Sequence, residues 1–159
     1  MDRLIPWGRA IPVDDAIDTA KAIGARVIRS QTLGDTIGCP ECIEPKLGEF
    51  NPEAFEHIDY AIKAAHDRGL RLIFTLVGDC ANCELGGAGE YSEDKGPAGI
   101  KGFFTDPKII ARFEEHIAAL LNHKNSLTGI VYKDDPTILA GKTATRADSS
   151  WPSPIRVRV

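Results

Sequence analysis

Amphipathic helical segments alternate with short apolar segments along most of this 159-residue chain. The clearest helix is predicted at 51–69, where Asn51 can cap the first turn, Pro52 suits the first helical position and Gly69 can end the helix. Apolar side chains recur there at three- and four-residue spacing, at Phe55, Ile58, Ala61, Ile62 and Ala65. Such a stripe must be covered by another element, so the alternation strongly limits the possible folds.

A nearly continuous apolar segment at 70–77 follows this helix and is typical of a strand buried on both faces of a parallel sheet. A helix at 14–24 likewise precedes a strand at 26–29, and a helix at 106–121 precedes a strand at 135–140. This order predicts an α/β fold of right-handed βαβ units, either a closed (β/α)₈ barrel or an open doubly wound sheet. Long connections follow the strands and contain no glycine-rich phosphate loop, which favours the barrel.

The charge balance bears on the expected partners. Lys and Arg total 19 against 23 Asp and Glu, a net charge of −4, which does not favour nucleic acid or an anionic membrane surface. No apolar run approaches the roughly 20 residues that span a bilayer, and no apolar stretch resembling a signal peptide follows Met1. We therefore expect neither a nucleic-acid nor a membrane partner.

Four cysteines form two pairs, Cys39 with Cys42 and Cys80 with Cys83, in consecutive connections after predicted strands. Two disulfides, free thiols and one tetrathiolate zinc site are all compatible with this pattern. The 37 residues between Cys42 and Cys80 exceed the roughly 15–20 typical of zinc ribbons. A small metal-binding or redox module built on these cysteines is therefore an alternative function.

Other polar residues have simple structural interpretations. Asp134 and Asp135 precede the last predicted strand, and we expect them to form a turn and cap before Pro136. The histidines lack metal-ligand spacing and fall on predicted helices, where we expect them at the surface: His57, His66, His116 and His123.

Arg29 ends a predicted buried strand where a long connection begins. A guanidinium at a cleft in that position needs a carboxylate or a substrate oxygen as partner. A solvated strand end is the alternative interpretation.

Several segments together resemble glycoside hydrolase family 5, in particular its endo-β-1,4-mannanase-like branch. The resemblance extends from about Ile11 to Ala140 and preserves order and approximate spacing. It is carried by 26–29, 47–51, 69–73, Gly86 and Gly87 with Tyr91, 103–107 and 125–140.

The resemblance implies that residues 1–140 are the N-terminal part of a (β/α)₈ TIM barrel, roughly strands two to four with their helices. It implies an extracellular parent enzyme that cleaves β-linked hexose polysaccharide of the β-mannan type, without a cofactor. Two glutamates would act with retention of configuration, one as acid/base and one as nucleophile, about 5 Å apart. Arg29 matches the arginine that supports the nucleophile, while Gly86, Gly87 and Tyr91 match the loop beside the sugar cleft.

The resemblance ends at Ala140. The family motif there is Trp-Glu-x-x-Asn-Glu, whereas residues 141–146 read Gly-Lys-Thr-Ala-Thr-Arg. Neither catalytic glutamate is present, so we expect this chain alone to be inactive. Residues 78–84 also lack the aromatic side chains typical of the family, which leaves the preference for mannan over glucan open.

Residues 141–159 carry a net charge of +3 and continue no helical or strand pattern, so we expect a disordered, non-homologous tail. A one-base deletion would explain the change. The genetic code permits GGG AAA ACT GCA ACG AGG as the codons of residues 141–146, and a T placed before them would give TGG GAA AAC TGC AAC GAG. The restored frame reads Trp-Glu-Asn-Cys-Asn-Glu.

Overall fold

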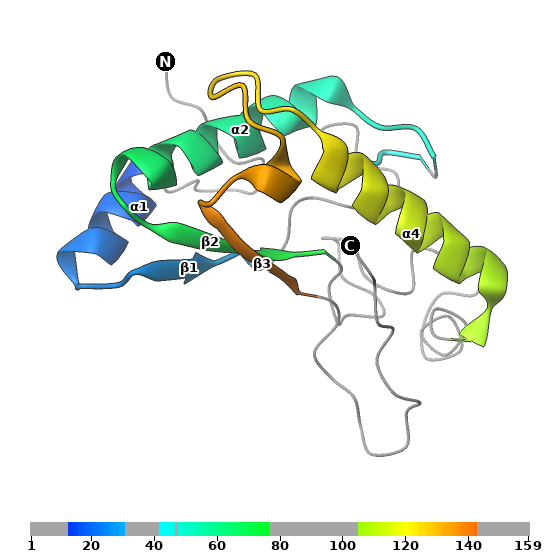
Figure 1. The fold of residues 1–159 in the computed structure, drawn as a ribbon, viewed down its shortest axis with the longest axis horizontal. Helices are drawn as coiled ribbons and strands as arrows, with labels where there is room; N and C mark the ends of the chain where they lie inside the picture. Colours follow the sequence, from blue (N-terminus) through cyan, green and yellow to red (C-terminus); the bar gives the residue numbers. More distant parts are fainter. Residues whose placement is uncertain (1–12, 31–41, 47, 77–104, 143–159) are drawn as a thin grey trace.

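The structure is a computed structural model that describes residues 13–30, 42–46, 48–76 and 105–142. Three strands form a parallel sheet in the order β1-β2-β3. Figure 1 shows α1, α2 and α4 on one side of this sheet. In chain order the elements are α1 (Val13–Ala22), β1 (Val27–Arg29), α2 (Pro52–Asp67), β2 (Arg71–Thr75), α4 (Pro107–Asn122), the 3-10 helix η2 (Tyr132–Asp134) and β3 (Ile138–Lys142).

This alternation confirms the predicted βα order. Parallel neighbours joined through helices are the repeating unit of a (β/α)₈ barrel, and the described residues form part of one. Within the described ranges, no helix has both the length and the apolar character needed to cross a bilayer.

The two long helices begin at the predicted caps. Asn51 Oδ1 accepts a hydrogen bond from the Glu53 amide at 3.0 Å, and Asp106 Oδ1 accepts one from the Lys108 amide at 2.8 Å. A proline occupies the first turn in both helices, where its missing amide hydrogen costs nothing. Gly69 follows α2 with φ +72°, a left-handed conformation that favours glycine.

The core lies between the helices and one face of the sheet. Each fully buried aliphatic or aromatic side chain there contributes about 1.5–3 kcal/mol of transfer free energy. The core includes Ile17 from α1, Phe55, Ile58 and Ile62 from α2, Leu72 and Phe74 from β2, Phe113, Ile117 and Leu120 from α4, and Tyr132 from η2.

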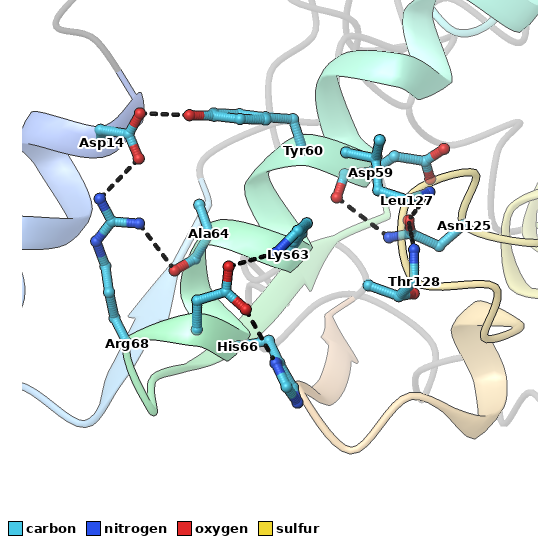
Figure 2. Close-up of polar contacts among 11 residues, drawn as sticks. Asp14, Asp59, Tyr60, Lys63, Ala64, His66, Arg68, Asn125, Leu127 and Thr128 are labelled. Carbon is cyan, nitrogen blue, oxygen red and sulfur yellow. Dashed lines mark hydrogen bonds and ion pairs between the residues drawn. The ribbon is translucent and has the colours of Figure 1, made fainter.

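A polar cluster on the outside joins α1 to α2. Arg68 Nη2 lies 2.8 Å from Asp14 Oδ1, and Arg68 Nε lies 2.5 Å from Asp18 Oδ1. The Tyr60 hydroxyl of α2 donates to the Asp14 carboxylate. Asp14 therefore contacts both Tyr60 and Arg68, the C-cap residue of α2, as Figure 2 shows. These contacts orient α1 against α2, although partly exposed ion pairs add little stability.

The last strand is longer than predicted. The backbone pairing continues past Ala140, with Gly141 opposite Phe74 and Lys142 opposite Thr75. Strand hydrogen bonds use only the backbone, so they do not require the apolar side chains on which the predicted boundary rested. A Cβ at Gly141 would lie 2.9 Å from Leu76 Cδ1, so glycine permits a close approach of these strand ends. The rest of the predicted tail lies outside the described residues.

Candidate functional site

The carboxyl ends of the three strands lie at one edge of the sheet, because the strands are parallel. Arg29 ends β1, Thr75 ends β2 and Lys142 ends β3. This is the edge at which (β/α)₈ barrels build their active sites.

Arg29 occupies the sheet face away from the helices. Leu72 and Phe74 point into the helix-covered core, so Ile73 between them points to the other face. Arg29 is the register partner of Ile73 and therefore shares its face. Its side chain is exposed, and no described residue forms an ion pair with it. A guanidinium placed in this way has its hydrogen-bond donors available for a carboxylate or a sugar oxygen.

Two hydroxyl side chains brace the strand end beside Arg29. The Thr75 hydroxyl donates to the Ser30 carbonyl at 2.6 Å, and the Thr75 amide donates to Ser30 Oγ at 3.3 Å. The Ser30 amide donates to the Ile73 carbonyl at 3.1 Å. The ladder between β1 and β2 therefore continues one residue beyond Arg29.

The opposite end of the sheet holds a buried cluster around Asp59 of α2. Asp59 Oδ1 accepts from the Tyr132 hydroxyl at 2.6 Å and lies 3.1 Å from His123 Nε2, while Oδ2 accepts from the Ser126 amide at 2.8 Å. Figure 2 shows Asn125 beside it, whose Nδ2 donates to the Asp59 carbonyl at 3.1 Å. This Asp59 cluster fixes the segment between α4 and β3 on α2.

Burial alone would raise the pKa of Asp59, but the hydrogen bonds from Tyr132, Ser126 and His123 outweigh it and hold that pKa below its usual value. Burial and the neighbouring Asp59 carboxylate raise the pKa of the Tyr132 hydroxyl. Asp59 is therefore a charged acceptor and Tyr132 a neutral donor over the physiological range. The cluster lies at the amino end of β3, away from the edge that carries Arg29, and its role is structural.

A second buried pair joins Glu44 to His116 of α4. The Glu44 Oε2 atom lies 2.9 Å from His116 Nδ1, and Oε1 accepts from the Gly48 amide at 2.6 Å. Burial would raise the pKa of Glu44, but these two hydrogen bonds outweigh it and lower the pKa. The contact ties the segment before α2 to the middle of α4.

The prediction that the histidines lie at the surface is wrong for His116, which is 1% exposed, and for His123, which is half-buried. The two residues are seven positions apart, on α4 and at its C-cap, so they lie on the same side of the helix as the apolar stripe. Asp59 likewise lies within the stripe of α2. Each of these polar residues falls at the three- and four-residue spacing of the buried apolar side chains on its helix. That spacing in the sequence could have predicted that these polar residues are buried. His57 and His66 are exposed, as expected.

Asp135 has the predicted turn-forming role. It is buried, and its Oδ1 accepts from the Thr137 amide at 2.8 Å. Asp134 lies beside it at the end of η2 and is exposed.

Cys42 is 2% exposed and is disulfide-bonded. A disulfide sulfur is no thiolate ligand, and within the described ranges no group of three or more potential ligands could hold a metal ion. Nothing in the described residues supports the metal-binding or redox alternative. The remaining predicted site residues lie outside the described residues: Cys39, Cys80, Cys83, Gly86, Gly87 and Tyr91.

No protein-family model matches the chain. Curated proteins similar to it include mannan endo-1,4-beta-mannosidase 1 of Oryza sativa subsp. japonica, 29% identical over 133 residues, and mannan endo-1,4-beta-mannosidase 2 of Arabidopsis thaliana, 31% identical over 134 residues. Each match covers 80% of this chain and 30% of the relative. The chain thus spans about a third of the length of the curated relatives it matches.

Mannanases are also among the solved structures that are similar to this chain. The endo-1,4-beta-mannanase from Rhizomucor miehei is 30% identical, with a TM-score of 0.71 over 83% of this chain and 38% of that one. A hyperthermostable endo-1,4-beta-D-mannanase from Thermotoga petrophila RKU-1 is 27% identical, with a TM-score of 0.68 over 83% and 40%. A glycoside hydrolase family 5 mannosidase from Rhizomucor miehei, 20% identical, shares the fold with a TM-score of 0.69 over 86% of this chain and 39% of that one. The chain is therefore similar to endo-1,4-β-mannanases over about a third of their length, and its fold corresponds to a part of the barrel of glycoside hydrolase family 5.

Proposed function

We propose that the protein to which this chain belongs hydrolyses the β-1,4 bonds of mannan with retention of configuration. The observation that carries this proposal is the 30% identity to an endo-1,4-beta-mannanase together with a TM-score of 0.71. The position of Arg29 supports it, because the exposed guanidinium stands at the edge where barrel enzymes bind substrate.

In this proposal Arg29 donates charge-assisted hydrogen bonds to the nucleophilic carboxylate. Such bonds keep the carboxylate ionised and oriented for attack on the anomeric carbon. The acid/base glutamate and the nucleophile would come from outside residues 1–140, since the motif Trp-Glu-x-x-Asn-Glu does not follow Ala140. The 159-residue chain alone therefore supplies one side of the cleft and no turnover.

We also propose that the parent protein works in an extracellular compartment. The disulfide at Cys42 supports this location, because structural disulfides persist in oxidising environments. The substrate is a polymer that would be met outside the cell.

The experiment compares the 159-residue chain with the full open reading frame of the gene when one base is restored after the Ala140 codon, because the nucleophile of a complete barrel comes from a later strand. Both are assayed for release of reducing ends from linear β-1,4-mannan, with carboxymethyl cellulose as the glucan control. We expect release from mannan only with the frame-restored product, and little from the glucan. Activity on the glucan alone would replace the proposed substrate, and no activity on either polymer would contradict the proposal.

A further inference from the structure

The brace between Ser30 and Thr75 lies directly beside Arg29 and holds the shortest described strand. β1 has three residues, so few backbone hydrogen bonds hold its end. Short strands with exposed ends open locally at low free-energy cost. Arg29 is the last residue of that strand, and its neighbour Ser30 carries the additional bonds.

Thr75 is suited to hold a backbone in place. It is 5% exposed, and its hydroxyl donates to the Ser30 carbonyl at 2.6 Å. A β-branched side chain has few rotamers, so the hydroxyl stays directed at that carbonyl. A buried hydroxyl without a partner would cost free energy, which favours the closed brace.

We propose that Ser30 and Thr75 are positioning residues that hold Arg29 at the substrate edge of the sheet. The proposal rests on the proposed function, in which the Arg29 guanidinium meets the nucleophilic carboxylate. Holding the backbone of Arg29 fixes the position and direction from which its long side chain starts, while the side chain keeps its own rotatable bonds. The residues act through Arg29 and are not themselves catalytic.

The test uses variants of the 159-residue chain that differ by single groups. Thr75→Val keeps the shape and removes the hydroxyl, whereas Thr75→Ser keeps the hydroxyl. Ser30→Ala removes the second half of the brace and leaves the buried core unchanged. Thr137→Val is the matched control, because Thr137 is also buried but lies at the amino end of the neighbouring strand.

The first readout is hydrogen exchange at the Ser30 amide with ¹⁵N relaxation of the Arg29 backbone and Nε. We expect Thr75→Val to speed exchange about tenfold and to mobilise Arg29, with Ser30→Ala giving a smaller effect in the same direction. Thr75→Ser should restore the wild-type values, and Thr137→Val should leave Arg29 unchanged. Unchanged Arg29 mobility in both Thr75→Val and Ser30→Ala would overturn the proposal.

The second readout separates this proposal from the function on which it rests. Mannotetraose is titrated while the Arg29 Nε resonance is followed. A shift in the wild type that is weakened at least several-fold in Thr75→Val, and restored in Thr75→Ser, supports the brace as a positioning device. An equal shift in all variants overturns it. If the wild type shows no shift while the mobility changes occur, the brace proposal stands on the first readout, and the assay of the frame-restored product decides the mannan assignment.

Discussion

The Tyr132 hydroxyl donates to the carboxylate of Asp59 at 2.6 Å, although the two residues are 73 positions apart in the chain. Asp59 is 1% exposed and accepts from both the side chain of Tyr132 and the backbone of Ser126. One carboxylate of α2 thus organises the segment that leads into β3.

Replacement of Asp59 by Asn should lower the free energy of unfolding by about 2–3 kcal/mol. The side-chain NH2 group of asparagine would place a second hydrogen-bond donor against the backbone amide of Ser126. The charge-assisted hydrogen bond from Tyr132 would also be lost. Urea unfolding followed by far-ultraviolet circular dichroism measures the change. Asp67→Asn is the control on the same helix, because Asp67 is exposed and contacts Lys63. Equal midpoints for the two variants would contradict a structural role of Asp59.

Acid should destabilise the protein through its buried carboxylates. Glu44 and Asp59 have pKa values below their ordinary values of 4.5 and 3.8. A lowered folded pKa contributes stability that is present above the ordinary pKa and is lost as the pH falls through the folded value. We therefore expect the free energy of unfolding to decrease below about pH 4.5.

The measurement is urea unfolding at pH 6, 4 and 3. The double variant Glu44→Gln with Asp59→Asn should show a shallower loss, because exposed acidic residues then account for what remains. A free energy that stays constant or rises on acidification would show that these pKa values are not lowered.

Cys42 should be unreactive in protein isolated from an oxidising compartment. Its sulfur is buried and disulfide-bonded, and we predict that all four cysteines are oxidised and cross-link the two connections. Non-reducing mass spectrometry after iodoacetamide treatment should detect no added mass. Reduction should lower stability by about 2–4 kcal/mol. Four alkylated thiols in the unreduced protein would contradict this prediction.

Arg29→Ala should leave the folding of the 159-residue chain almost unchanged, within about 0.5 kcal/mol, because the side chain is exposed. The same change in an active frame-restored product should reduce kcat by at least about a hundredfold, since a charge-assisted donor to the nucleophile is lost. Thermal unfolding and steady-state kinetics provide the two measurements. A loss of more than about 2 kcal/mol in the short chain would make Arg29 a structural residue.

The coding DNA should contain a one-base deletion after the Ala140 codon. With one base restored, we expect the codons of residues 141–146 to read Trp-Glu-x-x-Asn-Glu. Resequencing checks this directly. Codons that cannot encode this motif in the shifted frame would rule out a deletion as the explanation. The positively charged residues after Gly141 would then require a structural role.

Local signals predicted the elements of this fold but not its buried polar contacts. Asn51 and Asp106 cap their helices by contacts with residues two positions away, so a short window of sequence contains both partners. Glu44 and His116 are 72 positions apart, and their meeting depends on how α4 packs. Arg29 was predicted at the carboxyl end of a strand, and it is there. Its brace depends on the register of β1 against β2, which side-chain patterning alone does not determine.

The separation between Asp59 and Tyr132 also affects the order of events during synthesis. At about 5–20 residues per second, synthesis from Asp59 to Tyr132, a separation of 73 positions, takes roughly 4–15 seconds. Arg68 is added 64 positions before Tyr132, so its contact with Asp18 can form roughly 3–13 seconds before Asp59 gains Tyr132. Over that interval the nascent chain holds a carboxylate on the apolar face of α2 without its final donors. We therefore expect the nascent chain to become more stable, and less accessible to chaperones, once Tyr132 has been added.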